Sequence, residues 1–276
     1  SYFLLSYLYT SRNIIILVPI LFVIGYDHLY TGFAIDLATK KVLNNQFMKT
    51  WYQPPSNVLE AHNVTIDQIS RLTGGQGNTF ASNEIIFKPV FNRYEVLWYI
   101  DNFSKITSFD YLLATPLCGS DGEFIIDGWW AQKRLRGNEI TKNWAQKVKL
   151  SESLHQSLSI FEKPNWINQL DDPYSCADRM AWDESPLSYP EEIADLVSEL
   201  LIMKKPITLE RHQLIHGDLS GNMLYDQQTD QYAIIDFALY WRPAAYAKAI
   251  IISDAISWEG ADQEVFSAIK SEKNWN

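Results

Sequence analysis

The sequence predicts an α+β protein of two lobes, in which a small antiparallel sheet with one helix precedes a mainly helical region. Over residues 71–90, β-rich runs alternate with glycine and Ser-Asn turns, as in consecutive antiparallel strands. Beyond residue 133, apolar residues recur at the spacing of amphipathic helices. We therefore expect an N-terminal lobe over residues 48–132 and a C-terminal lobe over residues 133–276.

The composition favours a globular protein that binds small molecules. The chain has 276 residues, of which 47% are hydrophobic and 14% aromatic, enough for sizeable cores. Its formal net charge of -10 provides no broad basic surface for a nucleic-acid backbone, so we expect no nucleic-acid partner. The two cysteines, Cys118 and Cys176, form no CxxC motif, which argues against a disulfide framework or structural zinc and favours the cytoplasm.

The beginning of the chain differs from the rest. Apolar runs at residues 3–5 and 14–24 are separated by an Arg-Asn pair, and Pro19 lies inside the longer run. Each run is shorter than the roughly 20 residues that a membrane-spanning helix requires, so no membrane partner is expected. The apolar core of a secretory signal is an alternative. We expect residues 1–47 to be a dispensable or non-native extension, ahead of a compact domain that starts near residue 48.

The N-terminal lobe should contain about five strands and one helix. Residues 71–80 are expected to form a strand, a glycine turn and a second strand, and residues 84–90 a third strand. Apolar residues at helical spacing predict an amphipathic helix over residues 92–104 that packs against this sheet. Strands are expected again at residues 111–115 and 123–130.

The C-terminal lobe should contain helices around a long loop. Apolar periodicity predicts one long helix over residues 140–161. Residues 163–189 are rich in Pro, Trp, Asp and Ser without a clear period, which predicts a long loop, and loops of this length are commonly functional. A capping-box spacing from Ser188 to Glu191 predicts a helix directly after it, and Pro243 opens another.

The glycine turn of the first hairpin is a candidate phosphate-covering loop. Gly74, Gly75 and Gly77 allow the backbone to approach closely and to direct N–H groups at an anion. The alternative is an ordinary glycine-rich hairpin turn. The segment lacks the Lys-Ser/Thr pair and the following helix of a P-loop, so that interpretation and the dinucleotide-binding one both fail.

Lys88 and Glu95 form a second candidate pair. Lys88 lies among apolar residues on the third strand, where a cation needs a partner that phosphate oxygens could provide. Glu95, early in the following helix, could pair with Lys88 and hold it toward the phosphates. The alternatives are a solvent-facing lysine on an edge strand and an ordinary acidic residue in the first turn of a helix.

The most specific segment is His216 to Asn222, which is followed closely by the Ile-Ile-Asp-Phe stretch that contains Asp236. Asp218 could orient a hydroxyl group or accept its proton. Asn222 and Asp236 offer the hard oxygen ligands that Mg²⁺ shares with substrate phosphates. Phosphoryl transfer from a nucleotide to an alcohol needs these two provisions, orientation of the acceptor and neutralisation of the phosphate charge.

Residues 216–222, together with residues 234–237, resemble the catalytic and metal-binding signature of the aminoglycoside phosphotransferase and choline kinase group. More closely, residues 214–222 together with residues 235–243 resemble an actinobacterial branch of that group. The resemblance covers about residues 52–270. It implies a two-lobed protein-kinase-like fold, Mg²⁺ as cofactor, ATP or GTP as phosphate donor and a small-molecule hydroxyl as acceptor.

The resemblance also implies individual roles. Asp218 would be the catalytic base, and Asn222 and Asp236 would hold the metal. The remaining roles concern the nucleotide and the support of the catalytic loop. Lys88 would contact phosphates with Glu95 as its partner, the segment 128–133 with Trp130 and Gln132 would be the hinge that holds adenine, and Asp254 would anchor the loop by accepting backbone N–H bonds.

Three departures from the group's pattern are present. Asn222 follows Asp218 by four residues instead of five, and Ala238 replaces the usual glycine after the metal aspartate and its aromatic neighbour. The chain also ends soon after Trp258, where relatives add helices, so we expect a C-terminal truncation. The alternatives to an enzyme are a nucleotide-binding pseudokinase with a regulatory or scaffolding role, and a non-catalytic interaction domain.

Two groups of polar residues receive weaker expectations. The histidines outside the catalytic segment lack recognisable partners, so surface or capping roles are expected for His28, His62, His155 and His212. Several acidic residues of the long loop would suit a cationic amine on the acceptor side, but a solvated acidic loop is the favoured interpretation. They are Asp171, Asp172, Asp178, Asp183 and Glu184.

Overall fold

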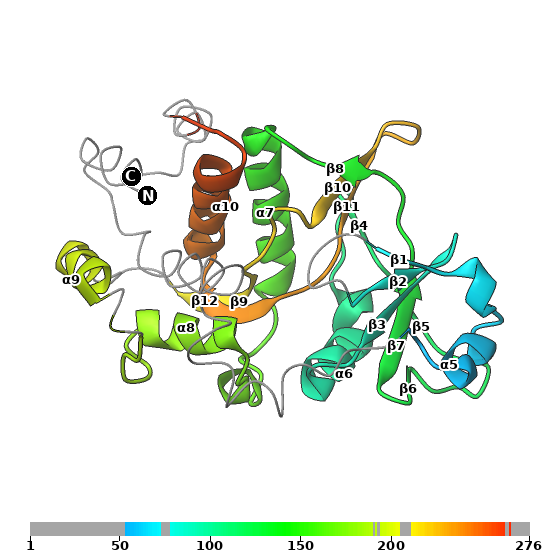
Figure 1. The fold of residues 1–276 in the computed structure, drawn as a ribbon. Coiled ribbons are helices and arrows are strands. Elements are labelled where there is room, and N and C mark those ends of the chain that lie inside the picture. The colour runs from blue at the N-terminus through cyan, green and yellow to red at the C-terminus, as the bar shows by residue number, and fades with distance from the viewer. Residues whose placement is uncertain are drawn as a thin grey trace.

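The computed structural model describes residues 53–72, 78–189, 191, 194–204, 211–262 and 265. It shows an antiparallel, sheet-rich N-terminal lobe and a mainly helical C-terminal lobe, which confirms the predicted fold class (Figure 1). The expected extension over residues 1–47 and the three glycines of the candidate phosphate loop lie outside the described residues. Within the described part of the chain, no helix combines the length and the apolar character needed to cross a bilayer.

One sheet of six strands forms the N-terminal lobe. Its main path runs β1-β2-β3-β7-β5, and β6 pairs with β7, all antiparallel. The strands are β1 (Ser70–Arg71), β2 (Phe80–Ala81), β3 (Ile85–Pro89), β5 (Pro116–Leu117), β6 (Ile125–Ile126) and β7 (Trp129–Lys133).

The two faces of this sheet have different environments because side chains alternate along a strand. Phe87 and Trp129 point to one face, where they pack with buried residues of α5 (Ser56–Ala61). Lys88 and its cross-strand partner Trp130 point to the other face. Helix α6 (Arg93–Asn102) lies on that second face, which is also the face toward the C-terminal lobe (Figure 1).

Most local predictions for this lobe are confirmed. The first hairpin closes with a hydrogen bond from Leu72 N to Thr79 O at 2.9 Å, and β3 follows a Ser82 turn. The predicted helix is α6, capped by Asn92, whose side chain accepts from two backbone N–H groups of the first turn. Short 3-10 turns lie before β1 and after α6, at η3 (Ile66–Gln68) and η4 (Phe103–Lys105).

Two strand predictions need correction. The strand expected at residues 123–130 is interrupted by Asp127 and Gly128, which both have positive φ, so it becomes the hairpin β6–β7. The strand expected at residues 111–115 is β4 (Leu112–Leu113), which pairs in parallel with β11 of the other lobe. Tyr111 belongs to the buried core of the C-terminal lobe, and this burial draws β4 across.

The C-terminal lobe contains two small sheets. One has the order β4-β11-β10-β8, with β8 (Asn138–Glu139), β10 (Met223–Asp226) and β11 (Gln231–Ile234). The other is a two-stranded ribbon of β9 (His212–His216) and β12 (Leu239–Pro243). Helices α7 (Trp144–Leu158) and α10 (Ala244–Trp258) lie side by side and contact β9 (Figure 1).

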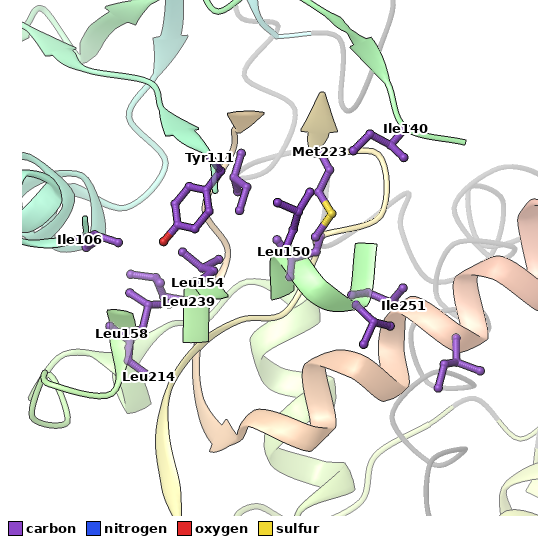
Figure 2. Packing of buried hydrophobic residues seen from close by; sticks show 14 of the residues in the cluster. Ile106, Tyr111, Ile140, Leu150, Leu154, Leu158, Leu214, Met223, Leu239 and Ile251 are labelled. Carbon is purple, nitrogen blue, oxygen red and sulfur yellow. The ribbon is translucent and has the colours of Figure 1, made fainter. Parts of the chain in front are cut away.

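The core of this lobe forms between α7, α10 and the strands. Leu150, Leu154 and Leu158 of α7 are fully buried and pack with residues such as Leu214 and Met223 (Figure 2). Burying a leucine side chain contributes about 1.5–3 kcal/mol. This packing fixes α7 against the segment that carries the catalytic motif.

The helix predictions for this lobe are confirmed in type, with shifted ends. The first helix starts at Trp144 after its cap Asn143. The long loop contains a helix of its own, α8 (Pro173–Ala181), because Asp172 caps two N–H groups and Pro173 occupies the first turn. A short turn, η5 (Ile167–Gln169), precedes it, α9 (Ala194–Met203) follows it, and α10 starts directly after Pro243 as predicted.

Candidate active site

The catalytic segment leaves the end of β9 through a tight turn at Gly217. Gly217 N donates to Ala238 O at 2.9 Å, which continues the β9–β12 ladder by one bond. A Cβ atom at Gly217 would lie 2.5 Å from Cδ2 of Tyr240, so the backbone approaches the tyrosine ring more closely than any side chain permits. Glycine is therefore required here for space.

Asp218 and Asn222 are held together by the loop. Asn222 Nδ2 donates to Asp218 O at 2.7 Å and approaches Asp218 Oδ2 at 3.3 Å. The Asp218 side chain is exposed, while its backbone N–H donates to His216 Nδ1 at 3.1 Å. Ile235 N donates to Asn222 O at 2.9 Å, which places Asn222 beside the end of β11 and next to Asp236.

Asp236 and Lys88 meet across the two lobes. Asp236 adopts a left-handed backbone conformation with φ of 51°, and its carboxylate forms an ion pair with the Lys88 ammonium group. The Lys88 side chain is only 13% exposed, whereas that of Asp236 is 44% exposed. Burial lowers the pKa of Lys88 to about 7. The structure thus joins Lys88 to Asp236, and Asn222 to Asp218.

Glu95 was expected to pair with Lys88, but the structure pairs it with a backbone group instead. Its Oε1 accepts a hydrogen bond from Leu239 N at 3.2 Å, at the start of β12. The first turn of α6 faces this strand, and Asp236 takes the place beside Lys88. Burial raises the pKa of Glu95 to about 7, and the bond from Leu239 opposes that rise.

The segment predicted to be the hinge, residues 128–133, is mostly strand β7. Trp130 and Gln132 lie inside β7, which is hydrogen-bonded to β3 on one side and to β5 and β6 on the other. A strand paired on both sides has few backbone groups left for adenine. The segment that connects the sheet to β8 is residues 134–137, which follows the expected position by a few residues.

The connecting segment packs closely on the hairpin that joins β10 to β11. Gly137 has φ of 126°, and a Cβ atom there would lie 2.8 Å from the backbone carbon of Tyr225. A polar cavity of about 350 Å³ lies beside this contact, lined in part by Arg136 and Asp226. The cavity lies on the linker and the hairpin, away from Asp218.

His216 is a neutral, fully buried support for the loop. Its Nδ1 accepts from Asp218 N, so its Nε2 is the protonated nitrogen and donates to Ile235 O at 3.3 Å. Burial lowers its pKa to about 4. The ring lies 5.1 Å from the Phe237 ring at a tilt of 33°, and Phe237 in turn lies 4.9 Å from the Tyr99 ring of α6.

His155 was missed as a site residue, because a surface or capping role was expected for it. It is 2% exposed, and its Nε2 accepts from His216 N at 3.1 Å. Its Nδ1 lies 3.1 Å from Ser151 Oγ, and burial lowers its pKa to about 3. The signal was available in the sequence, since Val148, Ser151, His155 and Leu158 share one face at helical spacing.

Asp254 lies under the catalytic loop on α10. Burial raises its pKa to about 7, and the neighbouring Ser220 hydroxyl partly offsets this rise. Asp254 thus lies next to Ser220 of this loop, and the bonds from backbone N–H groups that the resemblance implied stay a prediction.

The acidic residues of the long loop have structural partners. Asp178 and Glu184 both bind Arg242, with NH2–Oδ2 at 2.6 Å and NH1–Oε1 at 2.8 Å. Asp183 pairs with Lys204 at 2.6 Å, and Asp172 caps α8. The expectation of a solvated acidic loop is wrong for Asp178, which is 8% exposed.

Comparison with solved structures shows that the chain has the two-lobed protein-kinase-like fold of small-molecule phosphotransferases. An amicoumacin kinase, solved with AMP-PNP and Ca²⁺, has 14% identity and a TM-score of 0.54 over 83% of this chain and 80% of its own. An aminoglycoside phosphotransferase from Alicyclobacillus acidocaldarius has 14% identity and a TM-score of 0.53 over 79% and 76%. A choline kinase from Streptococcus pneumoniae has 10% identity and a TM-score of 0.51 over 78% of both chains.

No protein-family model matches the chain, and no curated protein matches it either. The structural likenesses therefore show the fold.

Proposed function

We propose that the protein is a small-molecule phosphotransferase that moves the terminal phosphate of ATP or GTP to a hydroxyl group, with Mg²⁺ as cofactor. The observation that carries the proposal is the meeting of Lys88 from the N-terminal lobe with Asp236 from the C-terminal lobe, beside the bonded pair of Asp218 and Asn222. This arrangement brings one cation, two carboxylates and one amide to the junction of the lobes. The similar folds of known phosphotransferases support it.

Asp218 is the proposed base. Its side chain is exposed, while its backbone is fixed through the N–H bond to His216 and the carbonyl bond from Asn222. A carboxylate fixed at its backbone and open at its side chain can orient an incoming hydroxyl and accept its proton. The hydroxyl oxygen then attacks the terminal phosphorus, and the nucleoside diphosphate leaves.

Asn222 and Asp236 are the residues that would hold Mg²⁺. Asn222 uses its Nδ2 atom to bind Asp218 O, so its Oδ1 atom is directed away from that bond and is available as a ligand. An amide oxygen and a carboxylate, completed by phosphate oxygens, are a donor set that Mg²⁺ prefers. When bound, the ion neutralises charge on the phosphates.

Lys88 is the proposed phosphate contact. Because its side chain is buried, it needs an anionic partner, and Asp236 fills that role in this structure. A phosphate close to Lys88 would favour its charged form and raise its pKa from about 7. We assign nucleotide binding to residues 48–132, with Gly74, Gly75 and Gly77 over the phosphates, and catalysis to residues 133–276.

The remaining nucleotide contacts need adjustment. Trp130 shares its sheet face with Lys88 and stays in the proposal as a wall of the cleft, as does Gln132. The adenine-holding role of the backbone moves to residues 134–137, which leave the sheet. In this proposal Glu95 supports the site by binding the backbone of β12, and not by pairing with Lys88.

The acceptor is proposed to be a small-molecule alcohol that needs no acidic pocket, because Asp178 and Glu184 are bound to Arg242. The resemblance to an actinobacterial branch remains part of the proposal. So does a cytoplasmic location, which rests on the two free cysteines, Cys118 and Cys176.

The test is a phosphotransfer screen over amino sugars, amino alcohols and sugars, with ATP and GTP as donors and Mg²⁺ present. Wild type should consume nucleotide with at least one acceptor, and Asp218→Ala should lose most of that transfer. Asp101→Asn, at an exposed position on α6, is the matched control. Equal transfer by wild type and Asp218→Ala would refute the role of Asp218.

A pseudokinase remains the second candidate, and one observation favours it. Asn222 follows Asp218 by four residues and bonds to it directly, so the loop is shorter than in the resembled group. Thermal-shift titration with ATP, with and without Mg²⁺, separates the candidates, since binding without transfer to any acceptor supports the pseudokinase. No stabilisation of wild type or of Asp236→Ala would favour a non-catalytic interaction domain.

A further inference from the structure

In the β9–β12 ribbon, two of the backbone donors that the ladder itself does not use lie at the end next to the proposed active site, at His216 and Leu239. His216 lies opposite Leu239 in the antiparallel register. The bond from Gly217 N to Ala238 O shows that the His216–Leu239 pair is of the type that exchanges no hydrogen bonds. The N–H groups of His216 and Leu239 therefore point outward, at opposite edges of the ribbon.

A side chain from a flanking helix accepts each of these donors. On one edge, His216 N donates to His155 Nε2 of α7 at 3.1 Å. On the other edge, Leu239 N donates to Glu95 Oε1 of α6 at 3.2 Å. Neither bond belongs to a sheet or a helix ladder, and each joins the ribbon to a different lobe.

The His155 bond constrains the ring as well as the backbone. A backbone N–H can only donate, so Nε2 of His155 must carry the lone pair and Nδ1 must carry the proton. Nδ1–H then donates a hydrogen bond to Ser151 Oγ, which lies 3.1 Å away and one turn earlier on α7. A pKa lowered to about 3 by burial keeps the ring in this neutral form.

The bond to His155 also restrains the position of Asp218, because His216 contacts both residues. His216 carries the bond to His155 on its backbone and the bond from Asp218 N on its ring. A shift of the His216 backbone would move its ring and then the Asp218 backbone. Leu239 lies opposite His216 in the ribbon, and it follows Asp236 by three residues in the sequence.

We infer that His155 and Glu95 are positioning residues, which hold the ribbon from its two edges and thereby fix Asp218 relative to Asp236. Neither residue needs to touch substrate for this role. The inference rests on the proposed function for its catalytic consequence, but the two edge bonds can be tested without any turnover.

The first test is hydrogen exchange of single amides in the whole protein, followed by NMR. His155→Met removes the acceptor at the His216 edge, and that amide should exchange at least about tenfold faster while the Leu239 amide stays near its wild-type rate. Glu95→Met should give the reverse pattern. His155→Gln and Glu95→Gln keep an acceptor oxygen at a similar reach and should restore protection.

Several outcomes would overturn the inference. Unchanged protection at His216 in His155→Met is one, and equal loss at both edges in either variant is another. His62→Met, at a half-buried histidine that packs on Phe87 in the N-terminal lobe, is the control for general loosening. If His155→Met does not fold, Glu95→Met still decides the inference at the other edge, where the loss of protection should be confined to the Leu239 amide.

The second test is kinetic and separates this inference from the proposed function. With an acceptor in hand, His155→Met should lower kcat by about tenfold or more with little change in KM for MgATP, and His155→Gln should recover most of it. Equal kcat in wild type and His155→Met would refute positioning. A wild type without any transfer would refute the proposed function, while the exchange pattern would still decide the edge bonds.

Discussion

Two ion pairs of this protein use similar groups in opposite ways. Arg242 is buried and binds Asp178 and Glu184 at once, through two edges of its guanidinium group, and the group lies 4.8 Å above the Trp182 ring. The Lys88 side chain is 13% exposed, and in the part of the chain that the structure describes its carboxylate partner is Asp236, which is 44% exposed. The Arg242 cluster is the more enclosed of the two, because its Asp178 side chain is 9% exposed and its Glu184 side chain 34%.

The pKa values follow the same division. Burial alone would lower the pKa of Arg242, but Glu184 and Asp178 together raise it above the usual value. The pKa of Lys88 is lowered to about 7 by burial. A buried cation that binds two carboxylates holds structural elements together. A buried cation whose carboxylate partner is partly exposed is suited to bind another anion. The contrast explains why the Arg242 cluster joins β12 to α8, while Lys88 faces the proposed nucleotide site.

The largest effect on stability is expected at the Arg242 cluster. Arg242→Leu should lower the free energy of unfolding by about 3–5 kcal/mol, because it leaves the buried Asp178 carboxylate, and the partly exposed Glu184 carboxylate beside it, without a cation. Urea denaturation followed by fluorescence measures this loss. Arg242→Lys should lose less, and a loss below about 1 kcal/mol for Arg242→Leu would remove the distinction between the two ion pairs.

The next largest effect on stability is expected at the tight turn of Gly217. Gly217→Ala should lower the free energy of unfolding by about 1–3 kcal/mol, since its Cβ would overlap the Tyr240 ring. A double-mutant cycle with Tyr240→Ala measures the coupling, because the alanine at 217 then has space. Additive losses in the cycle would show that the ring is not the cause.

A smaller effect should appear as a pH dependence. The folded pKa of His155 is about 3, below the unfolded value of 6.5, so in this window the unfolded chain binds a proton that the folded chain excludes. Stability should therefore fall as pH falls below 6.5, with a His155 contribution of about 1.4 kcal/mol per pH unit near pH 5. Urea titrations across this range should give a shallower slope for His155→Gln, and an unchanged slope would contradict the buried neutral state.

The smallest effect on stability is expected at Lys88. Lys88→Met should change the free energy of unfolding by less than about 1 kcal/mol, because the Asp236 carboxylate that it leaves is partly exposed to water. The same change should weaken MgATP binding by about tenfold to a hundredfold, as expected for a lost charged contact to phosphate. Calorimetric titration and urea denaturation of one sample provide both numbers. Large destabilisation with unchanged binding would reverse the comparison.

Local features could be predicted from the sequence where one residue type decides them. The Asn92 cap, the Pro243 helix start and the pairing of β1 with β2 all have such signals, and α6 and α10 follow their apolar spacing. The segment from His216 to Asn222 was identified from the sequence because it combines histidine, aspartate and asparagine and is followed closely by Asp236. The structure places its members side by side, as the proposed chemistry requires.

Pairing over long distances could not be predicted. A two-residue strand such as β4 has no period to read, so its choice of β11 depends on the core that forms around Tyr111. The partner of Glu95 depended on which N–H groups the ribbon leaves unused, which follows from register and not from spacing. His155 could be predicted in part. Its position on the apolar face of α7 indicated that it is buried, but not that it binds the backbone of His216.

The placement of β4 determines how the lobes can be separated. The chain enters the C-terminal lobe at β4, returns to the N-terminal sheet at β5 and leaves again through residues 134–137 (Figure 1). A protease cut within residues 134–137 would therefore yield two fragments that remain associated, because β4 of the first fragment stays hydrogen-bonded to β11 of the second. They would migrate as one species in native electrophoresis and divide only in detergent.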